Sequence, residues 1–158
     1  LILKPAYGNG GLGIEKIKKS KINLILHIKN YIKKYSSNPI IVQKFLKKFD
    51  KGDKRIILVN GKVKGAVLRL PKKNSIKANF HAGGSAIKTS LSLKEKLICK
   101  KLRKFLINNK LYFVGIDVID GHLTEINITS PTGIQEINKL NGVKIEKDII
   151  DFALKSLK

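Results

Sequence analysis

The stretch that decides the fold and the chemistry of this chain is Asp117-Val118-Ile119-Asp120-Gly121-His122-Leu123-Thr124-Glu125-Ile126-Asn127. An Asp-Gly pair between two segments of alternating apolar and polar residues predicts a β-hairpin that turns at Asp120-Gly121. Glu125 and Asn127 are two residues apart, so on a strand their side chains point to the same face. The stretch therefore offers hard oxygen ligands from one face of a sheet.

The turn decides whether Asp117 joins these ligands. A strict two-residue turn pairs Asp117 with Thr124 and puts Asp117 on the opposite face from Glu125. A three-residue loop with Gly121 as a left-handed bulge residue pairs Asp117 with Leu123, and all three ligands then share a face. Such a set predicts a Mg²⁺ site, and Mg²⁺ commonly accompanies nucleotide phosphates. The alternative is a group of solvent-exposed acids near a turn.

Length and composition indicate a globular protein. The chain has 158 residues, which suits one domain or two small lobes, and 42% of them are hydrophobic without a long apolar run. We therefore expect no membrane contact. The single cysteine, Cys99, favours a reducing cytoplasm and reads as a buried residue of a helix. The chain has no methionine and begins in what reads as a strand, so we expect it to be the C-terminal part of a longer protein.

The formal net charge of +22 raises the question of nucleic acid. All but three of the 33 basic residues are lysines spread along the chain, aromatic residues are only 6%, and no nucleic-acid motif is present. We expect no nucleic-acid partner, although a basic nucleic-acid-binding module remains an alternative. In such a chain an arginine suggests a need for the planar guanidinium fork. Arg55 and Arg69 lie in strand-like segments and are the candidates, whereas Arg103 reads as a surface residue of a helix.

Periodicity and turn residues predict an α+β fold with antiparallel strands. Ser92 followed by Glu95 forms a capping box for a helix. Residues 71–90 read as a long loop. We expect strands at 1–5, 14–17 and 40–46, a polar connection at 47–54, and a hairpin of strands 55–59 and 62–70 around Asn60-Gly61. A second hairpin is expected at 112–129, and helices at 20–35, 93–108, 134–140 and 147–157.

Three further segments are candidates for binding a nucleotide. The glycine-rich loop at 8–13 lies between two strands, so it lacks the context of a Rossmann or P-loop motif, but its N–H groups can still cover phosphates. Lys4 beside it supplies a positive charge. The segment at 43–46 offers strand-edge groups and an apolar wall for an adenine, and Asp53, expected in a loop, can accept hydrogen bonds from ribose. Taken alone, each segment also has an ordinary structural interpretation. The candidate nucleotide ligands are Lys4, Gly8, Gly10, Gly11, Gly13, Gln43, Lys44, Phe45, Leu46 and Asp53.

In this order, these motifs resemble the C-terminal ATP-grasp portion of bacterial, prokaryotic-type glutathione synthetase over essentially the whole chain. The most specific motif is the last, Thr124-Glu125-Ile126-Asn127-Ile128-Thr129-Ser130-Pro131-Thr132-Gly133. The others are Lys4-Pro5 with 8–13, 42–46, Gly52-Asp53-Lys54-Arg55, Leu68-Arg69-Leu70-Pro71, His81-Ala82-Gly83-Gly84 and 113–117.

The resemblance implies an ATP-grasp fold of two small lobes with antiparallel sheets that clasp a nucleotide, without the N-terminal substrate domain. Residues 1–46 would form the lid lobe and residues 47–158 the C-terminal lobe. The implied enzyme is a cytoplasmic ligase, with a homo-oligomer left open. It uses ATP with Mg²⁺ or Mn²⁺ to join γ-glutamylcysteine and glycine through an acyl phosphate.

The resemblance also implies roles for residues. Arg69, expected as a partly exposed side chain of the cleft, and, more weakly, Arg55 would stabilise the acyl phosphate, and the loop at 71–90 would close over it. The implied metal ligands are Asp117, Glu125 and Asn127, and the implied substrate-binding residues are Lys77, Asn79, Ser130 and Thr132.

Two positions depart from the family pattern. Lys77 and Ser85 stand where the family commonly carries arginine, and Ser85 does not keep the charge. Related ATP-grasp ligases that add other amino acids to a peptide or protein share the Asp and Glu-x-Asn residues. Such a ligase is the alternative enzyme.

Overall fold

The structure is a computed structural model that describes residues 1–7, 11–17, 23–35, 39–72 and 85–157. The chain divides into two compact units, Leu1–Lys47 and Lys48–Lys158. Each unit is described by itself below. None of the helices in the described ranges is long and apolar enough to cross a membrane.

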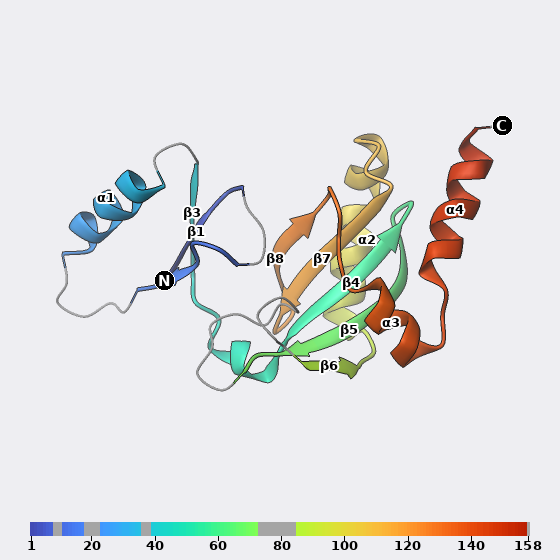
Figure 1. The fold of residues 1–158 in the computed structure, drawn as a ribbon, viewed down its shortest axis with the longest axis horizontal. Coiled ribbons are helices and arrows are strands. Elements are labelled where there is room, and N and C mark those ends of the chain that lie inside the picture. The colour runs from blue at the N-terminus through green and yellow to red at the C-terminus, as the bar shows by residue number, and fades with distance from the viewer. Residues whose placement is uncertain (8–10, 18–22, 36–38, 73–84, 158) are drawn as a thin grey trace. The chain divides into compact units, whose positions relative to one another are not determined.

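The first unit is a small antiparallel sheet with one helix (Figure 1). Its strand order is β2-β1-β3, with β1 at Ile2–Pro5, β2 at Glu15–Lys16 and β3 at Ile40–Gln43. The helix α1 spans Leu24–Lys34, and the Asn23 side chain caps its N-terminus by accepting from the Leu26 N–H.

The core of the first unit consists of Leu3, Ile17 and Tyr31. The Tyr31 hydroxyl donates to the Gly13 carbonyl at 2.6 Å, which ties α1 to the turn between β1 and β2. The apolar periodicity correctly predicted a helix here. The helix buries the face that carries Tyr31, whereas Ile25 on another face is 66% exposed.

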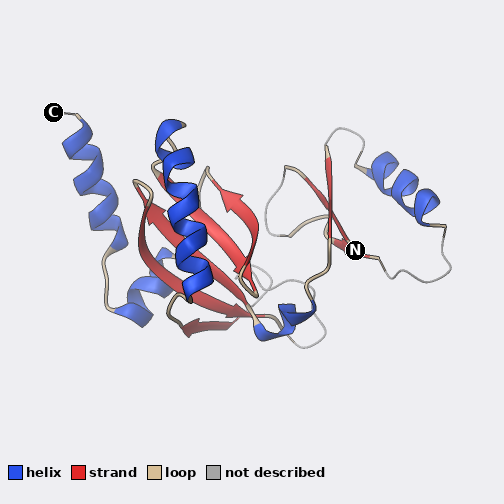
Figure 2. Ribbon diagram, turned by 180° about the vertical axis from the view of Figure 1, so that it is seen from behind, coloured by secondary structure: helices blue, strands red, loops and turns tan. Residues whose placement is uncertain are grey.

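The second unit is a five-stranded antiparallel sheet of order β6-β5-β4-β7-β8. The helix α2 covers one face, as Figure 2 shows from behind, and α3 and α4 pack on the other. The strands are β4 at Asp53–Val59, β5 at Lys62–Leu70, β6 at Ser85–Lys88, β7 at Phe113–Ile119 and β8 at His122–Asn127. The helices are the short 3₁₀ helix η1 at Lys47–Lys51, α2 at Leu93–Asn108, α3 at Ile134–Asn141 and α4 at Ile145–Ser156.

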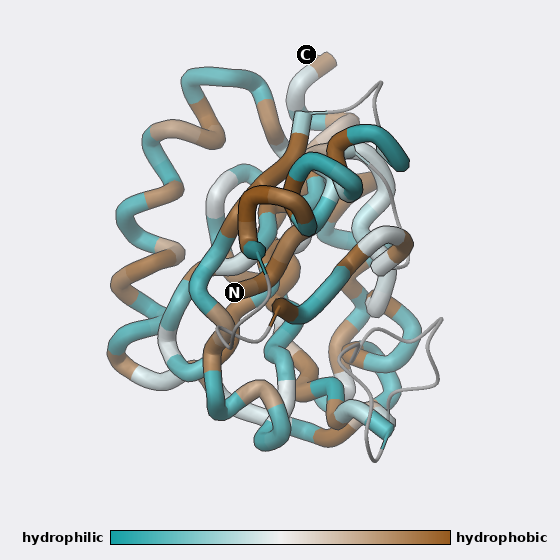
Figure 3. Tube along the Cα trace, turned by 90° about the vertical axis from the view of Figure 1, so that its left-hand side faces the viewer, coloured by the Kyte–Doolittle hydropathy of each residue, from teal (hydrophilic) through white to brown (hydrophobic). Residues whose placement is uncertain are grey.

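Each face of this sheet carries its own apolar cluster. Ile56, Val114 and Ile116 pack beneath α2 together with Cys99 of that helix. Ile57 and Val67 pack with Ile137 of α3 and Ile145 of α4 on the other face. Hydrophobic residues recur among hydrophilic ones along the helices (Figure 3), as expected for helices that cover a sheet with one side. Cys99 is buried as predicted, and burial raises the pKa of its thiol to about 11.

Two hairpins in this sheet share one design. Asn60-Gly61 joins β4 to β5 and Asp120-Gly121 joins β7 to β8, and all four residues have positive φ. Both are two-residue turns, and at Asp120-Gly121 this is one of the two options that the sequence left open. Each hairpin then contains a β-bulge, between Ile57 and Leu58 in the β4–β5 register and between Asp117 and Val118 in the β7–β8 register.

Several predicted boundaries were wrong. The strand β6 lies within the segment predicted as loop, because its backbone pairs with β5 although its sequence has little periodicity. The strand expected at 40–46 ends at Gln43, and the connection expected at 47–54 contains η1 and the start of β4. Asp53 is therefore a strand residue, not a loop residue.

Candidate functional site

The candidate metal ligands lie on one face of the second unit's sheet. Asp117 on β7 pairs with Glu125 on β8, and Asn127 follows two residues later, opposite Gly115. The three side chains share a face because Thr124 is an extra residue that bulges out of the ladder. Its Oγ1 donates to the Asp117 carbonyl at 3.1 Å.

The sequence predicted this shared face as one of two options. The three-residue loop with an Asp117–Leu123 pair, which was the option expected to give this face, does not form. Leu123 pairs instead with Val118. The two-residue turn is kept, and the bulge downstream of it restores the face.

A buried cluster of two acids and two arginines lies on the same face. Arg55 binds Asp117 through two parallel contacts, from Nε to Oδ1 at 2.6 Å and from Nη2 to Oδ2 at 3.0 Å. Arg69 contacts the same carboxylate, from Nη2 to Oδ2 at 3.0 Å, and also forms an ion pair with Asp53. The four residues are 1% to 9% exposed, so they form a buried network with equal numbers of acidic and basic side chains.

The charges in this cluster shift one another's pKa values. Burial, and then the negative charge of Asp117, raises the pKa of Asp53 above its usual value of 3.8, and the contacts with Arg69 only partly offset this. For Arg69, burial alone would lower the pKa, but the negative charges of Asp117 and Asp53 outweigh it and raise the pKa above its usual value. Among the described residues, Asp53 Oδ1 has no hydrogen-bond partner.

The structure corrects two expectations about these residues. Arg69 was expected as a partly exposed side chain at a cleft, but it is 1% exposed. Asp53 was expected in a loop, but it lies in β4 directly opposite Arg69 of β5. The β4–β5 bulge sets this pairing, because an unbroken ladder from the turn would bring Leu68, not Arg69, opposite Asp53.

Arg55 also fixes the loop that follows β8. Its Nη1 donates to the Thr132 carbonyl at 3.2 Å. All three guanidinium nitrogens of Arg55 therefore donate to this chain's own acceptors. The side chains of Ser130 and Thr132, the expected substrate-binding residues of this loop, are exposed.

The donor atoms on this face are oxygens, the ligand type that a magnesium ion prefers. Asp117 and Glu125 supply carboxylates and Asn127 an amide oxygen, and an ionised carboxylate can accept further contacts beyond those from arginine. No three His, Cys, Asp or Glu side chains gather at one point within the described ranges, so the amide of Asn127 is needed as the third ligand. The buried Asn127 Nδ2 has no hydrogen-bond partner in the part of the chain that the structure describes.

Sequence reasoning missed Gly115, which allows Arg55 its position. A Cβ atom at Gly115 would lie 2.6 Å from Pro131 Cβ and 3.0 Å from Arg55 Nη1. The available signal was a glycine in the interior of a predicted strand, which often marks a close approach of another group.

The candidate nucleotide residues lie in the first unit, apart from Asp53. Lys4 is in β1, and Gly11 and Gly13 adopt φ of 70° and 76° in the turn before β2. Gln43 ends β3, Lys44 and Leu46 lie after that strand, and the Phe45 ring there lies 3.8 Å from Lys16 Nζ. Gly8, Gly10, Lys77 and Asn79 lie outside the described residues.

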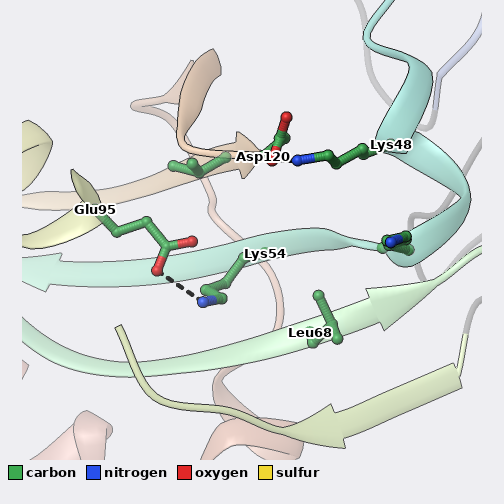
Figure 4. Close-up of a pocket in the computed structure, with 8 residues that line it drawn as sticks. Lys48, Lys54, Leu68, Glu95 and Asp120 are labelled. Atoms are coloured by element: carbon green, nitrogen blue, oxygen red, sulfur yellow. Dashed lines mark hydrogen bonds and ion pairs between the residues drawn. The ribbon is translucent and has the colours of Figure 1, made fainter. Parts of the chain in front are cut away.

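A crevice of about 160 Å³ lies on the α2 side of the sheet. In Figure 4 Lys54 points toward Glu95, and Lys48 toward Asp120. Lys54 Nζ lies 2.7 Å from Glu95 and 2.8 Å from the Ser90 carbonyl, and Lys48 Nζ lies 2.8 Å from Asp120. Each acid in the crevice forms an ion pair with a lysine. We therefore interpret these residues as structural and not as a binding site.

Comparison with known families gives one match that spans most of the chain. The model of the family described as the prokaryotic glutathione synthetase ATP-grasp domain matches residues 1–142. Proteins named glutathione synthetase are similar in sequence. That of Gloeobacter violaceus is 42% identical over 151 residues, covering 96% of this chain and 46% of the relative. That of Mesorhizobium japonicum is 42% identical over 145 residues, covering 92% and 46%. The chain thus spans about half the length of these relatives.

Solved structures of low sequence identity share the fold. D-alanine–D-alanine ligase from Bacillus anthracis gives a TM-score of 0.63 at 18% identity, covering 98% of this chain and 54% of the ligase. The ATP-grasp ligase PsnB, solved with a precursor variant, Mg and ADP, gives 0.59 at 18% identity, covering 99% and 46%. The predicted α+β ATP-grasp fold is therefore confirmed.

Proposed function

Because this chain belongs to the family of prokaryotic glutathione synthetase ATP-grasp domains, we propose that the protein uses ATP to join γ-glutamylcysteine and glycine into glutathione. The observation that carries the proposal is the family match over residues 1–142. It is supported by a sheet face that combines two fixed guanidinium groups with carboxylate and amide oxygens. In this reaction ATP phosphorylates the cysteine carboxylate, and the glycine amine then displaces phosphate from the acyl phosphate.

In this proposal Asp117, Glu125 and Asn127 hold Mg²⁺ or Mn²⁺. An ion held by these residues would supply positive charge that offsets the charge of the phosphates during phosphoryl transfer. Asp117 suits this role because Arg55 fixes its orientation with two contacts, so little reorganisation is needed when a ligand binds.

The two arginines would play unequal parts. Arg69 would stabilise the transferring phosphoryl group with its planar fork, which matches phosphate oxygens better than an ammonium group does. Arg55 is the weaker candidate, because its three nitrogens already donate to Asp117 and Thr132. Its contact with Thr132 instead supports the loop from which Ser130 and Thr132 would bind substrate.

The nucleotide would be bound by residues of the first unit. Lys4 and the glycines at 8–13 would hold its phosphates, and residues 43–46 would hold its adenine. The part of the 71–90 segment that precedes β6, with Lys77 and Asn79, would exclude water and bind substrate. This reaction belongs to the cytoplasm, where the single thiol of the chain would stay reduced.

The test is an assay of the protein at its full natural length. ATP, Mg²⁺, γ-glutamylcysteine and glycine should together release phosphate and yield glutathione, identified by mass spectrometry. Omission of glycine is the control and should suppress sustained phosphate release. Faster turnover with another pair of carboxylate and amine substrates would replace this proposal with another ATP-grasp ligase. Salt-dependent binding of nucleic acid without any nucleotide binding would contradict an enzymatic function and favour a nucleic-acid-binding module.

The metal assignment has its own test in Glu125→Gln. We expect the variant to need about tenfold or more Mg²⁺ for half-maximal turnover, because a neutral amide is a weaker ligand than a carboxylate. Asp120→Asn on the same hairpin is the matched control, since Asp120 pairs with Lys48 at the turn. Equal Mg²⁺ requirements of the two variants would contradict the assignment.

A further inference from the structure

We infer that Asp53 is a positioning residue, which fixes the guanidinium group of Arg69 on the site face through a buried ion pair across the β4–β5 ladder. The inference rests on the proposed function of Arg69. It gives Asp53 a different part from the ribose contact expected from the sequence.

The register of the sheet sets this pair. Asp53 is the first residue of β4 and lies opposite Arg69 of β5. The bulge between Ile57 and Leu58 is what brings the two residues into opposition. Bulges are common next to active sites, where they re-aim a side chain.

The two acids around Arg69 are not equivalent. Asp117 is shared, because its carboxylate also accepts two contacts from Arg55 and would bind the metal ion. The ion pair of Asp53 is with Arg69. When Asp117 turns to a ligand, Asp53 is the acid that remains to hold the guanidinium group.

The burial of both side chains makes this pair a rigid one. Arg69 is 1% exposed and Asp53 9% exposed, so water cannot readily take the place of either partner. A long arginine side chain held in one conformation spends no entropy on ordering itself in the transition state. Positioning by Asp53 should therefore act on turnover and not on nucleotide affinity.

The test compares Asp53→Asn with the wild type in the protein at its full natural length. We expect kcat to fall by about 10- to 100-fold, the scale of losing a supporting partner in a polar site, with the Kd for Mg-ADP, measured by calorimetry, within about twofold of the wild-type value. Asp50→Asn, an exposed acid on η1 three residues earlier, is the matched control and should retain normal kcat.

A double variant tests whether Asp53 acts through Arg69. If it does, Asp53→Asn should reduce kcat little further in an Arg69→Lys background, because the group it positions is already gone. Multiplicative effects of the two substitutions would overturn the inference. A tenfold or larger rise in the Kd for Mg-ADP with kcat retained would also overturn it and make Asp53 a nucleotide ligand.

A second substitution keeps the test valid if Asp53→Asn does not fold. Asp53→Glu keeps the charge but moves the carboxylate by one methylene group, so it should melt cooperatively and still lower kcat at unchanged Kd for Mg-ADP. Normal kcat in Asp53→Glu would contradict positioning. If the unaltered protein makes no glutathione but turns over ATP with other substrates, the proposed function fails, and the same comparison run with those substrates decides the role of Asp53.

Discussion

At Gly115 the backbone of β7 passes so close to Arg55 and Pro131 that no side chain fits. We predict that Gly115→Ala lowers the free energy of unfolding by about 1–3 kcal/mol, the usual cost of overpacking, and lowers turnover by displacing Arg55. Urea unfolding followed by circular dichroism measures the first effect. Gly142→Ala is the control, since Gly142 has a φ of 68° but no atom within 4 Å of the added Cβ. It should cost about 1–2 kcal/mol of backbone strain and leave turnover intact, and equal turnover in the two variants would contradict the argument.

The scarcity of arginine made Arg69 a candidate catalytic residue, and its burial changes what a substitution should do. We predict that Arg69→Lys leaves nucleotide affinity nearly intact and lowers turnover by about 10²-fold or more, as when one preorganised transition-state donor is removed. Stability should also fall, by about 1–3 kcal/mol, because an ammonium group cannot make the same contacts to Asp53 and Asp117. Arg103→Lys on the exposed surface of α2 is the control for both measurements. Near-normal turnover of Arg69→Lys would show that the guanidinium fork is not needed.

Residue types in the sequence singled out the members of the candidate site but not the contacts between them. The pairing of Asp53 with Arg69 and the contact of Arg55 with the Thr132 carbonyl join residues far apart in the chain. No local pattern encodes such contacts. They follow from the register of the sheet, which the turn residues set only in part.

Among the elements, α2 was predicted to the residue, because its start is encoded locally. The Ser92 side chain accepts from the Glu95 N–H at 3.3 Å, and Glu95 accepts from the Ser92 N–H at 2.7 Å. Glu95 also accepts from Lys54 at 2.7 Å, so the same carboxylate ties the helix to β4. Burial alone would raise the pKa of Glu95, but the contacts with Lys54 and Ser92 lower it below 4.5.

A pH-dependent contribution to stability follows for this element. A carboxylate whose pKa is lower in the folded state stabilises the fold above its unfolded pKa and loses that contribution as pH falls through the folded value. We predict that Glu95→Gln costs about 1–2 kcal/mol at pH 7, and that this difference from the wild type shrinks below pH 4.5. Urea unfolding at a series of pH values measures it, with Glu136→Gln in α3 as the control. A difference that stays constant down to acid pH would contradict the role of the charge.

In the two hairpins, local sequence patterns predict the turns but not the β-bulges. Asn60-Gly61 and Asp120-Gly121 predicted both turns, because both residues of such a turn need positive φ. The bulges at Lys64 and Thr124 carry no comparable signal, since neither residue is a glycine or a turn former. Yet these bulges decide which residues oppose Asp53 and Asp117, so the geometry of the site depends on the least predictable feature of its strands.

For the whole molecule, the order of the elements was predicted apart from η1 and β6, and the depth of burial was not. The central strands of the second unit, β4 and β7, carry nearly continuous buried runs because helices cover both faces of the sheet. The helix α1 gave an equally clear apolar pattern, but Ile25, Leu26 and Ile32 are 47% to 66% exposed. Periodicity identifies a helix but does not show how much of its apolar surface is covered.

The two units differ in the core that each can build. Among the described residues of the first unit, only Leu3, Ile17 and Tyr31 form a buried apolar cluster. The second unit has two such clusters, one on each face of its sheet. Chains of 40–60 residues bury too little surface to be more than marginally stable. The second unit should therefore hold most of the free energy of folding.

We predict that residues 48–158 fold alone with a cooperative thermal transition, and that residues 1–47 alone show none in circular dichroism. A cooperative transition of 1–47, or its absence in 48–158, would contradict this.

In the whole chain, native-state hydrogen exchange should then be faster for β1 and β3 than for β4 and β7. Mg-ATP should slow the exchange of β1 and β3 if Lys4 and residues 43–46 bind the nucleotide, because a ligand stabilises the state to which it binds. Slower exchange confined to the second unit would instead place the nucleotide contacts there, and the assignment of the glycine loop and β3 to the nucleotide would be wrong.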